Sequence, residues 1–186
     1  LSGGRVIVRP APESTFAPEE NVIAGNVIGY GATSGSIFIG GMVGERFLVR
    51  NSGVTAVVEG VGDHALEYMT GGLALILGQT GRNLGAGMSG GTAYIYNLDA
   101  KKVNADSLGS GELTLSQLGA SDSEIVRDLI ESHLAETGSP LAERLLANFA
   151  TEITHFTKVL PRDYAAVLQV RQEAEAAGID PDGDVT

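Results

Sequence analysis

His64 has two carboxylates close to it in the sequence, Asp63 and Glu67. An imidazole oriented by a carboxylate can transfer protons, so this trio could support general acid–base chemistry. A complete site would also need a nucleophile or a metal ligand beside the imidazole, and the chain contains no cysteine. A polar corner between two strands explains the same three residues without any catalysis, and we favour that interpretation.

A second possible chemistry is hydrolysis by paired carboxylates, as in glycosidases. Glu45 and Asp63 are 18 residues apart. If the chain repeats with that period, the two residues stack on successive turns about 4.8 Å apart. Each would then raise the pKa of the other unless Arg46 or Arg82 lies between them. This defines an alternative hypothesis, an independent β-helix with its own ligand-binding or carboxylate-based hydrolytic site.

The segment Gly85-Ala86-Gly87-Met88-Ser89-Gly90 matches the dinucleotide-binding pattern G-x-G-x-x-G. A functional copy of this pattern follows a strand and opens a helix, whose N-terminus holds the phosphates. Here a strand-like run, Thr92–Tyr96, follows instead, and Gly90 also belongs to a longer glycine series. We therefore interpret the motif as structural.

Metal-binding patterns are equally weak. His64, His133 and His155 have no partner at metal-ligand spacing, and the glycine near Asp180, Asp182 and Asp184 is misplaced for a calcium loop. The sequence therefore predicts no catalytic residue, no cofactor-binding residue and no metal ligand.

The strongest pattern in the chain is its glycine repeat. Steps of 18 or 19 residues separate glycines in two interleaved series, and these are predicted to be structural: Gly35, Gly53, Gly71 and Gly90, then Gly44, Gly62 and Gly81. Short apolar runs such as Ile37–Ile39 and Ala56–Val58 follow the first series. A fixed period of this size is typical of a solenoid, and it is too short for helical repeats. We predict an all-β fold, a right-handed single-stranded parallel β-helix of about 18 residues per coil, with an α-helical C-terminal tail.

Charge divides the chain in two. Residues 1–105 carry 8 acidic and 7 basic side chains, whereas residues 106–186 carry 15 acidic and 5 basic ones. We therefore predict a β-helix over 1–105 and a helical tail over 106–186 that packs on or caps it, the two forming one domain of a larger protein. The net charge of −11 argues against nucleic acid or an anionic membrane as partner. No apolar segment is long enough to span a bilayer, and we expect a cytoplasmic location.

Three helices are expected in the tail. Ser121-Asp122-Ser123-Glu124 reads as a capping box, followed by apolar residues at helical spacing, among them Ile125 and Leu129. Ser139-Pro140 predicts the N-cap and first residue of a second helix. A third is expected to begin at Pro161 or Asp163 and to end near Gly178.

Several segments together resemble the C-terminal glycine-repeat domain of the glutamate synthase large subunit. They are Gly44–Gly53, Ala56–Gly60, Glu67–Gly72, Leu77–Gly91 and Phe156–Tyr164. The similarity covers nearly the whole chain and preserves the order of the segments. A weaker similarity is to the β-helical structural subunit of formylmethanofuran dehydrogenase, which would not be expected to share the Pro161–Tyr164 ending.

The resemblance implies a part of an oxidoreductase of glutamate biosynthesis and nitrogen metabolism. Such enzymes hydrolyse glutamine at an N-terminal cysteine and pass ammonia through a tunnel. They then reduce an iminoglutarate at an FMN beside an iron–sulfur cluster. The domain of this type is regarded as a non-catalytic brace between the amidotransferase and synthase domains, and a small electron-transfer subunit is a possible further partner. The resemblance therefore implies no activity and no cofactor for this chain alone.

Overall fold

The computed structural model describes residues 1–176. Its strands are β1 (Ser2–Val8), β2 (Val22–Ala24), β3 (Ser34–Val43), β4 (Thr55–Gly60), β5 (Thr70–Ile76), β6 (Gly90–Tyr96), β7 (Leu113–Gln117) and β8 (Phe156–Pro161). Its α-helices are α1 (Ala105–Gly109), α2 (Ala120–Thr137), α3 (Pro140–Ala147), α4 (Phe149–Glu152) and α5 (Arg162–Ala176). Short 3-10 helices lie at η1 (Pro18–Glu20), η2 (Ala100–Lys102) and η3 (Ile153–His155).

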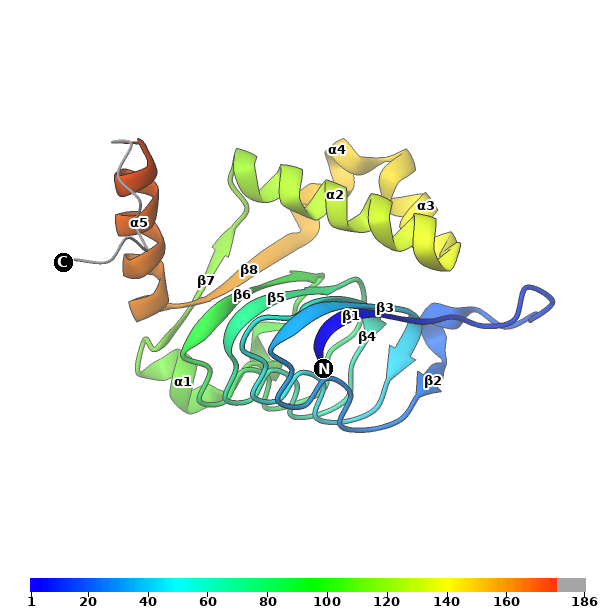
Figure 1. The fold of residues 1–186 in the computed structure, drawn as a ribbon, viewed down its shortest axis with the longest axis horizontal. Helices are drawn as coiled ribbons and strands as arrows, with labels where there is room; N and C mark the ends of the chain where they lie inside the picture. Colours follow the sequence, from blue (N-terminus) through cyan, green and yellow to red (C-terminus); the bar gives the residue numbers. More distant parts are fainter. Residues whose placement is uncertain (177–186) are drawn as a thin grey trace.

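The strands β1, β3, β4, β5 and β6 stack in that order, and every neighbouring pair is parallel. Ile37 lies opposite Ala56, which lies opposite Ala74, which in turn lies opposite Ala93. These offsets of 19, 18 and 19 residues equal the glycine period. The predicted parallel β-helix is therefore confirmed, and Figure 1 shows its coils stacked side by side.

Both faces of the stacked strands are buried. Side chains alternate between the two faces of a strand, so in β4 Ala56 and Val58 enter the core inside the solenoid, whereas Val57 points outward. Val57 joins a second core with apolar residues of α2 and α3, including Val126 and Leu145. Two-sided burial explains why these strands read as nearly continuous apolar runs.

A second repeated segment connects the strands, and its backbone alternates in handedness. Within residues 27–31, 46–50, 64–68 and 83–87, the first, third and fifth positions all have positive φ angles between 54° and 73°. The amide of Arg46 donates to Asp63 O of the following coil, and the amide of Leu48 donates to Ile28 O of the preceding one. We name these four segments the left-handed edge.

Residues after the last coil form two strands as well as helices. β8 pairs antiparallel with β6, and β7 pairs antiparallel with β8, so this hairpin covers the last coil. Helices α2, α3 and α4 lie over the outer face of the sheet, and α5 lies apart from them at the β7–β8 end (Figure 1). The sequence predicted the helices of this part of the chain but not its two strands.

The helix boundaries agree with the predictions only in part. Ser139 caps α3 by accepting the amide of Ala142 at 3.0 Å, as predicted. The capping box predicted at Ser121 is wrong, because α2 begins at Ala120 and the Asp122 carboxylate accepts the Gly119 amide at 3.1 Å. Ile125, one of the apolar residues noted at helical spacing, is 41% exposed, and its neighbour Val126 is buried instead. α5 begins at Arg162, and the expected end near Gly178 lies outside the described residues.

Close approach of neighbouring coils gives the repeat glycines a physical reason. A Cβ added at Gly53, Gly71 or Gly90 would lie 2.1, 2.3 or 2.0 Å from a carbonyl oxygen of the preceding coil. None of these glycines has a positive φ angle, so the constraint is the available space. Any side chain at these positions must push two coils apart.

Replacing Gly90 by alanine should lower the free energy of unfolding of the chain by about 3 kcal/mol, because the new methyl group meets the Thr70 carbonyl. The matched control is Gly25→Ala, where an added Cβ has no heavy atom within 4 Å. It should change stability by less than about 0.5 kcal/mol. Urea denaturation followed by circular dichroism measures both, and equal effects of the two changes would contradict this account.

Candidate functional site

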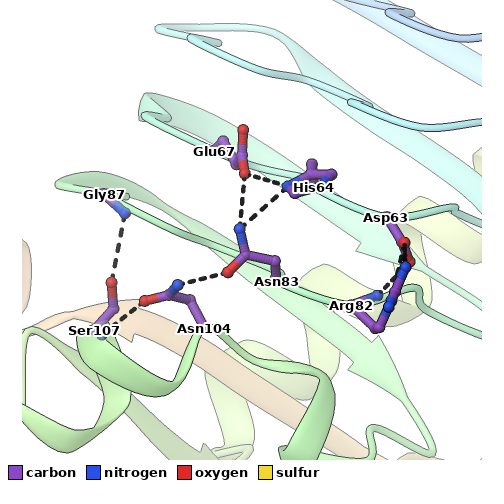
Figure 2. Close-up of polar contacts among 8 residues, drawn as sticks. All are labelled: Asp63, His64, Glu67, Arg82, Asn83, Gly87, Asn104 and Ser107. Atoms are coloured by element: carbon purple, nitrogen blue, oxygen red, sulfur yellow. Dashed lines mark hydrogen bonds and ion pairs between the residues drawn. The ribbon is translucent and has the colours of Figure 1, made fainter.

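His64, Glu67 and Asn83 form a polar cluster on the left-handed edge (Figure 2). His64 Nδ1 lies 2.6 Å from Glu67 Oε1, and Asn83 Nδ2 lies 3.1 Å from the same carboxylate oxygen. His64 and Glu67 belong to one coil, and Asn83 occupies the position equivalent to His64 in the next coil. The coil spacing therefore brings the three side chains together.

The hydrogen-bonding partners favour one tautomer of His64. Asn83 Nδ2 also lies 3.1 Å from His64 Nδ1, but an amide NH₂ group can only donate. With the proton on Nδ1, the imidazole and Asn83 both donate to the Glu67 carboxylate, and every contact with that carboxylate is satisfied. No side chain within residues 1–176 bonds His64 Nε2, and the His64 side chain is 36% exposed.

The cluster continues onto the next turn of the chain. Asn104 Nδ2 donates to Asn83 Oδ1 at 2.6 Å, and Asn104 Oδ1 accepts the Ser107 amide at 2.8 Å, which caps α1. Ser107 Oγ accepts the Gly87 amide at 3.4 Å. Figure 2 shows these side chains as one series from Glu67 to Ser107, which we name the corner network. The corner network joins the last coils of the solenoid to Asn104 and helix α1.

Asp63 stands outside the corner network because it pairs with Arg82. Its carboxylate accepts the Arg82 amide at 2.6 Å and the guanidinium at 2.8 and 3.1 Å. The backbone and side-chain bonds from Arg82 lower the pKa of Asp63 below its ordinary value. The sequence predicted a raised pKa for stacked Glu45 and Asp63 unless Arg46 or Arg82 lay between them, and Arg82 pairs with Asp63.

His64 and Glu67 have the arrangement of a base and the carboxylate that orients it. A working acyl-transfer or hydrolytic site also needs a nucleophile bonded to the other imidazole nitrogen. Among the described residues no hydroxyl bonds to His64, and Asp63 is occupied by Arg82. The three residues singled out in the sequence thus form one carboxylate–imidazole pair and one separate ion pair.

The glycine motif at Gly85–Gly90 does not lead into a helix. Its residues lie in a turn, and β6 begins at Gly90. A cavity of about 280 Å³ beside Gly87 and Met88 is also lined by Glu112 and Asp163. Two carboxylates would repel a diphosphate, so this geometry agrees with the structural interpretation of the motif.

A buried polar cluster that the sequence did not predict joins the solenoid to the helices. Glu59 of β4 and His133 of α2 are both fully buried, with His133 Nε2 3.0 Å from Glu59 Oε1. Ser139 Oγ donates to the same oxygen. The sequence offered no signal for this cluster, because Glu59 and His133 are 74 residues apart and meet only when α2 packs on the sheet.

Asp122 forms a further link between the layers. Tyr94 Oη donates to Asp122 Oδ1 at 2.6 Å, and Lys158 Nζ donates to the same oxygen at 2.8 Å. Burial raises the pKa of Tyr94, and its hydrogen bond to Asp122 raises it further. Burial alone would raise the pKa of Asp122, but bonds from Lys158, Tyr94 and the Gly119 amide hold it below its ordinary value.

The donor set of this chain does not fit an iron–sulfur cluster. Such clusters are held by cysteine thiolates, and the sequence has none. Within residues 1–176, no three histidine, aspartate or glutamate side chains converge in a way that could hold a metal ion. No helix in the same range is long and apolar enough to cross a membrane.

Comparison with known proteins identifies the family. The model of the GXGXG motif family matches residues 1–162. This chain belongs to the GXGXG family. The matched range contains the whole glycine repeat and the corner network.

Relatives of this GXGXG chain are glutamate synthases. It is 53% identical over 172 residues to glutamate synthase [NADH] of Schizosaccharomyces pombe, covering 91% of this chain and 8% of the relative. It is 45% identical to the glutamate synthase [NADPH] large chain of Bacillus subtilis, covering 96% and 12%. It is 44% identical to ferredoxin-dependent glutamate synthase 2 of Synechocystis, covering 87% and 10%. The chain thus spans about a tenth of the length of these relatives.

Asn83 is central to the corner network, and its φ angle of 60° lets glycine replace it without steric cost. Asn83→Gly should therefore lower the free energy of unfolding of the GXGXG chain by about 1–3 kcal/mol through lost hydrogen bonds. Asn97→Gly is the control, because Asn97 also has a positive φ angle but is exposed. It should change stability by less than about 0.5 kcal/mol in the same denaturation assay. Unchanged stability of Asn83→Gly would show that the network contributes little.

The lowered pKa of Asp122 gives a pH dependence with a definite sign. Its contribution to stability is present above the ordinary carboxyl pKa of 3.8 and is lost as pH falls through the lower folded value. Between about pH 5 and pH 2, Asp122→Asn should therefore lose less stability than the parent chain. Asp163→Asn, at a side chain that is 94% exposed, should keep the parental dependence. Denaturation midpoints across this range measure the difference, and parallel curves for Asp122→Asn and the parent would contradict the assignment.

Proposed function

We propose that this chain is a non-catalytic structural domain of glutamate synthase. In this role it braces the amidotransferase domain against the synthase domain, which carries FMN and an iron–sulfur cluster. The observation that carries the proposal is the GXGXG match over residues 1–162, together with glutamate synthase relatives that align over most of this chain. The chain would serve ammonia assimilation by its geometry and not by its own chemistry.

The described residues support a mechanical role. The coils are linked by backbone hydrogen bonds from β1 to β6, and α2 is tied to them through Glu59–His133 and Asp122–Tyr94. A stack bonded in this way resists bending, because any bend must break bonds between coils or open a packed core. A rigid body of this kind can hold two active sites at a fixed separation, so that a diffusible intermediate stays enclosed.

The proposal has further parts. Residues 1–105 and 106–186 would act together as one domain, with the other domains of the same polypeptide as partners. A cytoplasmic location and a small electron-transfer subunit as a further partner belong to this proposal as well. The iron–sulfur cluster would be held elsewhere in the polypeptide, because this chain lacks cysteine, and FMN would be held beside it.

The test uses the full-length polypeptide and measures glutamine hydrolysis and glutamate formation separately. Gly90→Ala, which loosens the stack, should lower the glutamate formed per glutamine hydrolysed while hydrolysis continues. Glu67→Gln disables the only carboxylate–imidazole pair of the described left-handed edge. If that pair is not catalytic, both rates should change by less than about twofold, whereas loss of general acid–base catalysis would lower a rate about a hundredfold or more. Gly25→Ala is the control for expression and folding.

Two results would contradict the proposal. A hundredfold loss of either rate in Glu67→Gln would assign catalysis to the corner network and favour the alternative of an independent site. An unchanged ratio of the two rates in Gly90→Ala, at a temperature where the domain is measurably loosened, would remove the bracing role.

A further inference from the structure

The left-handed edge concentrates unusual backbone conformations. Within residues 1–176 nine non-glycine residues have positive φ angles, and eight of them lie on this edge. For an L-residue this conformation costs roughly 1–2 kcal/mol, and strain of this kind gathers at functional sites. The edge therefore needs an explanation residue by residue.

Several of the eight residues are explained by the fold. Leu48 and Leu66 are fully buried and fill the core inside the solenoid. His64 and Asn83 belong to the corner network. Each of these four side chains gains contacts that offset its backbone cost, whereas Val27, on the first of the four segments, is 45% exposed and is not explained by burial.

Arg46 and Arg50 lack such an explanation, and Tyr68 has only the contact of its ring with Gly87 of the next coil. Both arginines are exposed, and Tyr68 is 56% exposed. Glycine occupies the position of Arg50 and Tyr68 in the neighbouring coils, at Gly31 and Gly87, so the fold accepts a residue without strain there. Arg50 thus keeps a backbone conformation that glycine adopts without strain, and no ion pair or side-chain hydrogen bond of Arg50 within residues 1–176 offsets that cost.

The charges of the edge point to the chemistry of its partner. Neither Arg46 nor Arg50 has an ion pair or a side-chain hydrogen bond among the described residues, whereas the nearby Arg82 is paired with Asp63. These two unpaired cations are notable in a chain of net charge −11. Arginine and tyrosine are, with tryptophan, the residues enriched at the energetic centres of protein interfaces. Arginine also binds carboxylates through two parallel hydrogen bonds.

We propose that the left-handed edge is the docking surface for a carboxylate-bearing surface of the same larger polypeptide. Arg46 and Arg50 form ion pairs across this contact. Tyr68, on the coil that follows these two arginines, packs against the same partner surface. The occupant is assigned to the same polypeptide because this chain spans only 8–12% of the length of its relatives. This inference rests on the proposed bracing function and names the surface that performs it.

Photo-cross-linking in the full-length polypeptide tests the contact directly. p-Benzoylphenylalanine is incorporated in place of Tyr68, and in a separate sample in place of Ile125, which is 41% exposed on α2. After irradiation, mass spectrometry should find cross-links from position 68 to a segment outside residues 1–186 that carries aspartate or glutamate. The proposal would be overturned by cross-links that form only within residues 1–186, to a different molecule, or to a segment without carboxylates. It would also be overturned if position 125 cross-linked to the carboxylate-bearing segment with the same yield as position 68.

Glycine substitutions separate docking from folding. Arg46→Gly with Arg50→Gly removes the backbone strain, so the denaturation midpoint of the purified chain should stay the same or rise. In the full-length polypeptide the cross-link yield from position 68 should fall by about tenfold, because two charge pairs are lost. Arg162→Gln, at a residue with 62% side-chain exposure, is the control and should leave the yield unchanged. An undiminished yield in the double variant would exclude the arginines from the contact.

Failure of this inference is distinguishable from failure of the proposed function. If Gly90→Ala uncouples glutamine hydrolysis from glutamate formation but the double arginine variant does not, the domain braces the enzyme through another surface. If neither variant uncouples the two reactions, the bracing function itself is wrong.

Discussion

The closeness of neighbouring coils is the constraint on which the rest of the structure depends. Parallel strands lie about 4.8 Å apart, which leaves no space for a side chain where a coil passes over a carbonyl group of the preceding coil. Gly53, Gly71 and Gly90 occupy those positions. With the spacing fixed, equivalent positions of successive coils lie in register. The corner network is a direct product of that register, since Asn83 reaches His64 and Glu67 only because it sits one coil further on.

Polar contacts decide how the helical layer is placed on this stack. An apolar helix face could settle on an apolar sheet in several positions, whereas the fully buried Glu59 and His133 must meet each other. Asp122 adds a second fixed point by accepting bonds from Tyr94 and Lys158, one from β6 and one from β8. Buried pairs of this kind contribute modest net stability, and their larger effect here is to select one arrangement of the two layers.

The sequence predicted the solenoid well because its period is local and repeated. The interpretation of Ser139-Pro140 as a helix start also succeeded, since capping depends on adjacent residues. Predictions failed where distant segments had to meet. The pairing of β8 with β6, the partner of Glu59 and the choice of Val126 over Ile125 for the buried face all depend on how the C-terminal part folds back. Alternating backbone handedness was not predicted either, because arginine, leucine and tyrosine give no local signal for positive φ angles.

The antiparallel strand β8 has a consequence for how such a chain can change in evolution. A parallel coil exposes an edge on which another coil of the same kind can be built, so a solenoid can be lengthened by duplication of a whole repeat. β8 runs in the opposite direction along β6 and is itself covered by β7, which leaves no template for a further coil at that end. Duplication or loss of coils must therefore occur on the β1 side of β6, and it must keep β4 in place, because Glu59 of β4 bonds to His133 of α2.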